Sequence, residues 1–261
     1  LNALLKAVPF QRLVLRLSRA VAANAEHLHG LQPGHILYGA PLQGPVPFLE
    51  NGLRFAADVV RGQKTGFFFD HRHNRARVET LSSGREVLNL FAYTGAFSLY
   101  AARGGAPLVV SQDLSAPALA AARENFARNV ADPRVAAARH ELIEGDAFEA
   151  LNDLHTAQRA FDMIVVDPPS FANTMAEVPA ALRAYERLTR RSLRLLRPRG
   201  VLVMASCTSR VTPPQFYETV RHAAASAGYD LQEIARSEHA LDHPITFPEG
   251  QYLKCLFARL S

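Results

Sequence analysis

Cysteine is scarce in this sequence, and long apolar runs are missing from it. Only two cysteines occur, Cys207 and Cys255, which argues against a disulfide framework and against a cysteine-rich zinc site. We therefore expect a reducing, cytoplasmic location. No apolar run approaches the ~20 residues that a membrane-spanning helix needs. Basic residues interrupt each apolar stretch near the first residue, so we predict no signal peptide.

The remaining composition is that of an ordinary globular protein. Of the 261 residues, 48% are hydrophobic and 20% are charged. This length suits one large α/β domain, or one domain with a small appendage. The formal net charge is +5 and the sequence pI is about 9.5. Such an excess of positive charge is compatible with a nucleic-acid partner but does not require one.

Residues 1–66 are predicted to form a β-rich domain of a linker type. The run RLVLRL, from Arg12 to Leu17, has a nearly continuous apolar core. We predict a strand there, with an amphipathic helix as the alternative. The dipeptide Asn51-Gly52 lies between two apolar runs and readily adopts positive φ angles. The sequence therefore predicts a β-hairpin at this dipeptide.

Residues 67–261 show the pattern of a Rossmann-like α/β domain. Apolar runs typical of buried strands alternate with helical segments of about 10–15 residues, which indicates βαβ units and a parallel sheet. The predicted strands are EVLNLF, PLVVSQD, HELIEGD, FDMIVVD, GVLVMAS, YDLQEIA and QYLKCLFARL. No helix separates the last two, so an antiparallel final strand is expected. The predicted fold is a mostly parallel seven-stranded sheet after a small β-rich region.

A turn glycine, three carboxylates and a thiol follow the five parallel strands. Gly95 follows the first strand, Asp113, Asp146 and Asp167 follow the next three, and Cys207 follows the fifth. Ligands of open α/β sheets bind beyond these carboxyl ends. A carboxylate after the second strand suits a ribose diol, and one after the third suits an adenine amino group. Each aspartate taken singly is also a typical helix N-cap, but the whole set favours a nucleoside site.

The segment FAYTGAFS lacks the GxGxxG fingerprint of dinucleotide-binding folds. Its single glycine, Gly95, allows a tight turn and a close approach of a ligand. A pyrophosphate needs backbone contacts at several points, whereas a cofactor without phosphates does not. The missing glycines therefore favour S-adenosylmethionine over a nicotinamide dinucleotide, and a methyltransferase over a dehydrogenase.

Six segments carry a resemblance to a known family: ENGLRF, GQKTGFFFDHR, VLNLFAYTGAFSLYAARGGA, VDPPSF, SCTS and DHPITFPEGQYLK. With them the chain resembles the bacterial large-subunit ribosomal RNA methyltransferases of the cytosine-5 type. That family joins a PUA domain, a small linker domain and a Rossmann-like catalytic domain. The resemblance implies S-adenosylmethionine as cofactor and ribosomal RNA as partner. The cofactor contacts that it implies are Lys64, Thr65, Phe67, Asp70, Arg72, Phe91, Ala92, Tyr93, Thr94, Gly95, Asp113, Asp146 and Asp167.

Two features depart from the family pattern. Fewer than 50 residues precede Glu50, the first residue of ENGLRF. That is too few for both a PUA domain and a linker domain, so we expect a truncated chain or a branch without its RNA-docking module. In addition, His71 stands where the family usually has glutamine.

The family resemblance suggests covalent chemistry for Cys207 and Asp167. Carbon 5 of cytosine is a poor nucleophile, and a thiolate that adds to carbon 6 turns the ring into a reactive enamine. We assign Cys207 as this nucleophile and Asp167 as the group at ring nitrogen 3. Pro168 and Pro169 have no N–H donors, so their backbone presents carbonyl acceptors to the cytosine amino group. Arg210 is expected to lower the thiol pKa from about 8.5.

The two cysteines differ in their surroundings. A free cysteine at a strand end is commonly a small buried hydrophobe, which is the alternative for Cys207. Its position among polar residues at the ligand-binding edge favours a function. Cys255 alternates with Leu253 and Phe257 on one strand face and is predicted to be a core residue.

The DPPSF segment is also compatible with methyl acceptors other than cytosine carbon 5. It is similar to the Asp/Asn-Pro-Pro-aromatic motif of enzymes that methylate exocyclic amines, but Ser170 displaces the aromatic residue by one position. That residue, Phe171, is counted with the predicted substrate contacts. Methylation of a guanine ring nitrogen is a further alternative. Outside the enzymes, the alternative is a non-catalytic RNA-binding module on the same fold.

A helix predicted from Pro179 to Leu196 carries a basic stripe. The stripe consists of Arg183, Arg187, Arg190 and Arg194, which share one helix face. It is interpreted either as a solvated face or as a contact with RNA phosphates. The histidines lie in no HExxH spacing and have no cysteine partners, so we predict no metal site.

Overall fold

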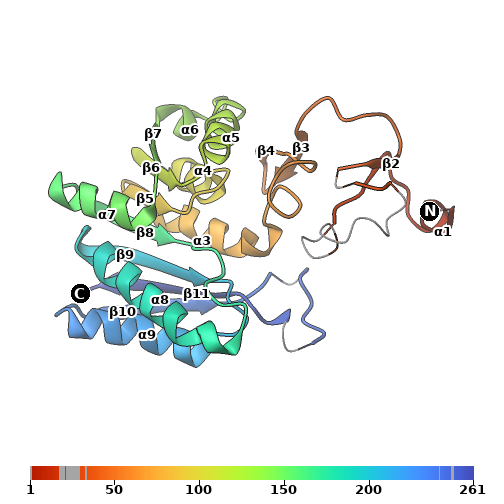
Figure 1. Cartoon of the computed structure of the whole chain (residues 1–261). Helices are drawn as coiled ribbons and strands as arrows, with labels where there is room; N and C mark the ends of the chain where they lie inside the picture. The colour runs from red at the N-terminus through yellow and green to blue at the C-terminus, as the bar shows by residue number, and fades with distance from the viewer. Residues whose placement is uncertain (1, 18–20, 22–29, 33, 241, 248–249) are drawn as a thin grey trace. The chain divides into compact units, whose positions relative to one another are not determined.

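Residues 2–17, 21, 30–32, 34–240, 242–247 and 250–261 are described by a computed structural model of the chain (Figure 1). The chain divides into two compact units, Leu1–Phe69 and Asp70–Ser261. The first unit holds two small antiparallel sheets, and the second holds a large sheet.

The first unit contains one short helix and two strand pairs in its described part. Its elements are α1 (Asn2–Ala7), β1 (Leu13–Val14), β2 (Ile36–Tyr38), β3 (Val46–Glu50) and β4 (Leu53–Ala57). The predicted hairpin is confirmed: β3 and β4 are antiparallel, and Asn51 and Gly52 between them have φ angles of 48° and 84°. The strand predicted over RLVLRL is confirmed only over the two residues of β1. Helix α1 is not expected from the sequence pattern.

The second unit contains one seven-stranded sheet. Its strands are β5 (Glu86–Leu90), β6 (Leu108–Asp113), β7 (Arg139–Glu144), β8 (Phe161–Val166), β9 (Leu196–Ser206), β10 (Leu231–Ser237) and β11 (Lys254–Leu260). The strand order is β10-β11-β9-β8-β5-β6-β7. Strands β5 to β9 are parallel, whereas β11 is antiparallel to both β9 and β10. This confirms the predicted Rossmann-like α/β fold with an antiparallel last strand.

Helices connect the strands and cover both faces of the sheet (Figure 1). They are η2 (Phe69–His71), α3 (Arg72–Leu81), α4 (Ala96–Arg103), α5 (Ala116–Ala127), α6 (Pro133–Ala137), α7 (Ala147–Thr156), η3 (Met175–Glu177), α8 (Val178–Leu193) and α9 (Pro213–Ser226). Helix α3 is not expected from the sequence, because RHNRARVETL contains only three apolar residues. The expected N-cap of α5 is confirmed: the Ser115 side chain accepts from the Ala118 amide.

The core explains why the central strands of the sheet are rich in apolar residues. Leu88 of β5 and Ile164 of β8 belong to a buried cluster with Tyr185 of α8 and Phe216 of α9. Helices α4 and α5 pack against β6 on the opposite face. Because both faces of the sheet are covered, its central strands bury their side chains on both sides, whereas the edge strands β7 and β10 stay partly exposed.

Candidate active site

The strand register brings the carboxyl ends of the five parallel strands to one edge of the sheet. Leu90 at the end of β5 pairs with Gln112 of β6 and with Val166 at the end of β8. Val166 in turn pairs with Met204 of β9, and β7 ends beside the last residue of β6. The turn glycine, the three carboxylates and the thiol that follow these strands therefore share this edge.

The FAYTG loop after β5 has an unusual backbone. Phe91, Tyr93 and Gly95 have φ angles of 56°, 48° and 74°, a left-handed region that residues other than glycine seldom adopt. The Tyr93 amide donates to Asp113 Oδ2 at 2.7 Å, which ties the loop to the end of β6. A Cβ on Gly95 would lie 2.7 Å from the Ala122 Cβ. Only glycine fits this turn without a shift of α5.

The other two residues of this loop, Ala92 and Thr94, are buried. The Ala92 amide donates to the Gln112 carbonyl at 2.8 Å. The Thr94 carbonyl accepts from the Asn125 side chain at 3.0 Å. Backbone groups of the loop are thus hydrogen-bonded to β6 on one side and to α5 on the other.

The two carboxylates after β6 and β7 have different local roles. Asp113 is half-buried, and its Oδ1 accepts from the Ser115 amide at 2.9 Å. Asp146 is exposed and caps α7, where its Oδ1 accepts from the Phe148 and Glu149 amides at 2.8 and 3.1 Å. The capping role considered for a single aspartate is therefore real at Asp146. Its ligand role stays a prediction.

Asp167, directly after β8, lies against a buried histidine. His71 Nε2 is 3.2 Å from Asp167 Oδ1. The other ring nitrogen of His71, Nδ1, is 3.1 Å from Asn74 Nδ2 on α3. The sequence pattern did not assign His71 a function.

Cys207 follows β9 and is half-buried, with its Sγ 3.7 Å from the Pro168 carbonyl oxygen. The Phe171 amide donates to Thr208 Oγ1 at 3.1 Å. The hydroxyl of Tyr185, a buried core residue, lies 2.7 Å from the same Thr208 hydroxyl. The DPPSF and SCTS loops are therefore joined through side chains. Pro169 is exposed and Arg210 is half-buried on these loops, and their substrate roles stay predictions.

Lys254 supports the Cys207 loop from beneath. It is fully buried, and its ammonium donates to the carbonyls of Thr208 and Val211 at 2.7 and 2.8 Å. Burial lowers the pKa of Lys254 to about 8, and the nearby Cys207 opposes this shift. Lys254 lies in the segment DHPITFPEGQYLK, but only the pairing of β11 with β9 places it under the loop.

The prediction that Cys255 is a core residue is confirmed. Its side chain is fully buried in β11, and burial raises the pKa of its thiol. The two cysteines therefore differ as expected: one lies at the edge where the strands end, and the other lies inside the sheet.

The predicted cofactor contacts of the KTGFFFDHR segment fall in different units. Lys64, Thr65 and Phe67 belong to the first unit, where Phe67 is buried and packs edge-on against Phe48 at 4.8 Å. Their contact with a cofactor stays a prediction. Asp70 belongs to the second unit.

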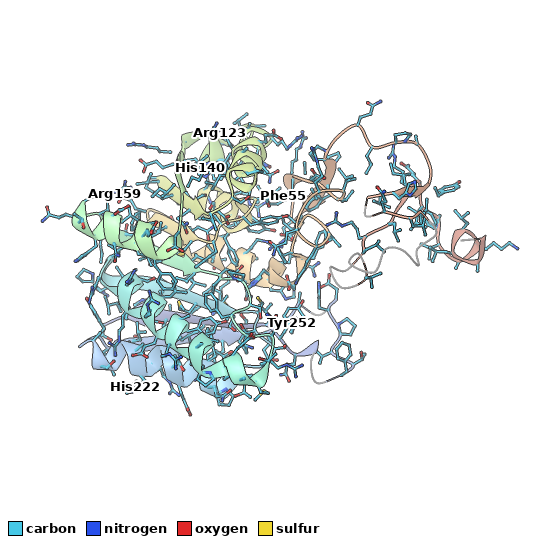
Figure 2. All side chains as sticks on the ribbon, viewed as in Figure 1. Phe55, Arg123, His140, Arg159, His222 and Tyr252 are labelled. Carbon is cyan, nitrogen blue, oxygen red and sulfur yellow. The ribbon has the colours of Figure 1, made fainter. Side chains whose placement is uncertain are left out.

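In the second unit this segment meets the C-terminal segment. Tyr252, labelled in Figure 2, donates its hydroxyl to Asp70 Oδ2 at 2.8 Å. Arg72 pairs with Asp242 at 2.7 Å. His239 stands edge-on to Tyr252 at 4.4 Å, and its buried ring nitrogens make no hydrogen bond within the described residues. The KTGFFFDHR and DHPITFPEGQYLK segments, which match the family pattern separately, are thus in contact with each other.

The predicted basic stripe on α8 is partly occupied by contacts within the protein. Arg187 lies over the Phe148 ring at 4.4 Å. Arg190 pairs with Glu186 at 2.7 Å. Arg183 and Arg194 are exposed, so the stripe has fewer uncommitted cations than its sequence suggests.

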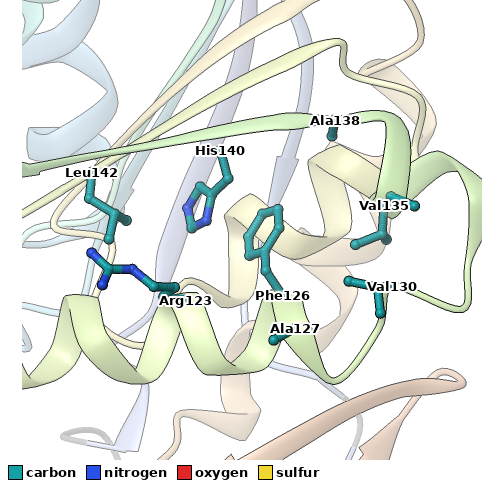
Figure 3. Close-up of a pocket in the computed structure, with 9 residues that line it drawn as sticks. Arg123, Phe126, Ala127, Val130, Val135, Ala138, His140 and Leu142 are labelled. Atoms are coloured by element: carbon teal, nitrogen blue, oxygen red, sulfur yellow. The ribbon is translucent and has the colours of Figure 1, made fainter.

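A separate cavity of about 480 Å³ lies between α5, α6 and the edge strand β7 (Figure 3). His140 stacks on Phe126 at 3.7 Å in it, and Arg123 also lines it. None of the residues singled out from the sequence lines this cavity. Among the described residues, no cluster of three or more histidine, cysteine or acidic side chains is placed to hold a metal ion. No helix of the described chain is long and apolar enough to cross a membrane.

Known proteins match this chain over most of its length. A family model described as S-adenosylmethionine-dependent methyltransferase matches residues 28–259. The ribosomal RNA large subunit methyltransferase of Deinococcus radiodurans is 46% identical over 248 residues, which cover 95% of this chain and 60% of that protein. The ribosomal RNA large subunit methyltransferase I of Shewanella frigidimarina is 41% identical over 228 residues, 86% of this chain and 56% of that protein. The chain thus spans little more than half the length of these relatives.

Solved structures share the fold. A protein named as a SAM-dependent methyltransferase from Streptococcus mutans superposes with a TM-score of 0.76 at 26% identity. A structure named as a methyltransferase complexed with SAH gives a TM-score of 0.75, also at 26% identity. Each match covers 92% of this chain and 64% of the other chain.

Proposed function

Because the chain belongs to the family of S-adenosylmethionine-dependent methyltransferases, we propose that it methylates carbon 5 of a cytosine in large-subunit ribosomal RNA. The observation that carries this proposal is the juxtaposition of two adjacent strand ends. Cys207 Sγ lies 3.7 Å from the Pro168 carbonyl, directly beside the carboxylate Asp167 in sequence. Covalent activation of cytosine requires a thiolate and an acid or donor at ring nitrogen 3, and the later loss of the carbon-5 hydrogen requires a base. Cys207 and Asp167 suit the first two of these roles.

The residues at the ends of β5, β6 and β7 suit S-adenosylmethionine. The left-handed turn at Gly95 folds the loop back tightly at the end of β5, where the Tyr93 amide donates to Asp113. The half-buried Asp113 suits the ribose hydroxyls, and Asp146 keeps Oδ2 for an adenine amino group because only its Oδ1 caps α7. The loop lacks the three glycines of a phosphate-binding loop, and a cofactor without phosphates does not need them. Bound S-adenosylmethionine supplies an electrophilic methyl group.

The residues at the ends of β8 and β9 act on the cytosine. The Cys207 thiolate adds to carbon 6 while Asp167 gives a proton to ring nitrogen 3, which leaves carbon 5 nucleophilic. After carbon 5 gains the methyl group, its hydrogen passes as a proton to solvent water. The electron pair of that bond forms the double bond between carbons 5 and 6, and the bond between carbon 6 and sulfur breaks to release the Cys207 thiolate. The proton on nitrogen 3 then returns to Asp167. The Pro168 and Pro169 backbone accepts hydrogen bonds from the cytosine amino group and holds the ring in register.

The RNA substrate is supported by relatives and by charge. Both relatives described above are named as large-subunit ribosomal RNA methyltransferases. The net charge of +5 suits an anionic partner. The linkage to a PUA domain stays a prediction.

The experiment compares Cys207→Ala with Cys255→Ala. Methyl transfer is measured from labelled S-adenosylmethionine to unmodified large-subunit ribosomal RNA, and the product nucleoside is identified by mass spectrometry. We expect the Cys207 variant to lose 5-methylcytosine formation, since only its thiolate can add to carbon 6. The Cys255 variant, altered at the buried cysteine, serves as the matched control and should keep it.

A second measurement traps the covalent step. RNA containing 5-fluorocytosine should form an adduct with the protein that survives a denaturing gel, because fluorine at carbon 5 blocks the release of the thiol. The adduct should be absent with Cys207→Ala. Full methyl transfer by this variant, or a methylated guanine or exocyclic amine as the product, would refute the proposed chemistry.

A further inference from the structure

A series of polar side chains in contact with one another runs from β10, an edge strand of the large sheet, to Asp167. It begins at Ser237, the last residue of β10, whose hydroxyl donates to Asn74 Oδ1 on α3. Asn74 Nδ2 lies 3.1 Å from His71 Nδ1, and His71 Nε2 lies 3.2 Å from Asp167 Oδ1. Asn74 and His71 are only 1% and 4% exposed. Water therefore has little access to replace these contacts.

The direction of this series follows from its first hydrogen bond, in which the Ser237 hydroxyl is the donor. The Ser237 hydroxyl donates to Asn74 Oδ1, so the amide nitrogen of Asn74 is the atom that faces His71. An amide nitrogen only donates, so His71 Nδ1 must accept. A neutral imidazole carries a single N–H, which is then on Nε2 and faces the Asp167 carboxylate. The Phe97 ring, edge-on at 5.3 Å, holds the imidazole plane.

We propose that His71 is a positioning residue that fixes the Asp167 carboxyl through a locked Nε2–H tautomer. This inference rests on the proposed role of Asp167 at ring nitrogen 3. The histidine N–H occupies Oδ1, so the acid proton of Asp167 sits on Oδ2, the oxygen left for the substrate. When Asp167 gives that proton to nitrogen 3, the negative charge that remains is stabilised by the same N–H. His71 neither gains nor loses a proton in the cycle.

Two variants separate the N–H from the ring. His71→Phe keeps a flat ring but removes the donor, and His71→Gln places an amide N–H donor in the same buried position. We expect His71→Phe to lower the single-turnover rate of methyl transfer by about 10²-fold, because the acid is no longer held in place. The His71→Gln variant should recover the rate to within about tenfold of the wild type. Neither should change the KM for S-adenosylmethionine.

His140→Gln is the matched control. His140 is half-buried and lies 2.8 Å from a serine hydroxyl, that of Ser111, but it lies on β7 away from Asp167. It should leave the methyl-transfer rate unchanged near neutral pH. Equal loss of rate in His71→Gln and His71→Phe would overturn the inference, since it would show that the ring and not its N–H matters.

A spectroscopic test needs neither RNA nor turnover. Long-range ¹H–¹⁵N spectra of the wild-type protein report which ring nitrogen carries the proton, and the His71 signal is the one missing in His71→Gln. We expect a neutral ring protonated at Nε2. A ring protonated at Nδ1 would overturn the inference, and this test decides even when the Phe variant does not fold. If the wild-type protein formed no adduct with 5-fluorocytosine RNA, that result would count against the proposed function. The failure of the proposed function and the failure of this inference are therefore distinguishable.

Discussion

The buried Lys254 should make the stability of this protein rise steeply with alkaline pH. Burial lowers the pKa of Lys254 to about 8, against an ordinary value of 10.5. Between these values the unfolded chain binds a proton that the folded chain has released. Folding therefore becomes more favourable as the pH rises through this window, and the effect is flat below pH 8, where both states are protonated.

The size of the effect follows from the difference between the two pKa values. It corresponds to about 3 kcal/mol of unfolding free energy gained between roughly pH 8 and pH 10.5. No hydrogen bond has to be lost in this change, because a neutral amine keeps two N–H donors for the Thr208 and Val211 carbonyls. Lys254→Met removes the titrating group and should remove this gain.

The assay is urea denaturation followed by circular dichroism, at about pH 7.5 and about pH 10. Other alkaline groups titrate in both proteins, so the difference between wild type and Lys254→Met isolates the lysine. Lys6→Met, altered at an exposed lysine on α1, is the control and should follow the wild type. Parallel stability curves for the wild type and Lys254→Met would refute the reasoning, since they would show that the buried ammonium keeps its ordinary pKa.

Two further predictions concern the turn after β5 and the histidine at the sheet edge. Gly95→Ala should weaken S-adenosylmethionine binding in calorimetry and lower stability more than Gly84→Ala. Both glycines have φ near 70°, and the left-handed backbone alone costs an alanine about 1–2 kcal/mol. A Cβ at Gly84 meets nothing within 4 Å, whereas one at Gly95 meets Ala122, so equal losses in the two variants would contradict the contact with Ala122. Burial, aided by Arg123, lowers the pKa of His140 to about 4 from 6.5, so about 3 kcal/mol of unfolding free energy should be lost as the pH falls through that window. Denaturation of His140→Gln across the same range should lack this loss, and an unchanged pH dependence would contradict it.

Local sequence signals predicted the elements that position the site. Apolar runs marked the strands of the large sheet, and Asn51-Gly52 marked the hairpin, because strand burial and positive φ angles are encoded within a few neighbouring residues. The residues that follow the strands could be listed for the same reason. Their grouping at one edge needed only the rule that parallel strands end together.

Signals that depend on distant partners were missed. Helix α3 has few apolar residues, and its buried Asn74 and Arg75 are stabilised by partners elsewhere in the fold. The sequence pattern gives no role to His71 or Lys254, because the first contacts Asp167 and the second contacts the carbonyls after Cys207, and these partners are distant in the chain. The contact of Arg187 with the Phe148 ring was missed for the same reason.

The sequence by itself determined the order of the strands of the large sheet along the chain and the chemistry available at each strand end, because these depend on periodicity and on turn residues close together in the chain. Only the tertiary structure decided which of those groups face one another. The insertion of β11 between β9 and β10 put Lys254 beneath the Cys207 loop, and the approach of η2 to the end of β8 put His71 against Asp167. Such contacts join residues separated by tens of positions, so their energy is set by packing and burial that no local pattern records.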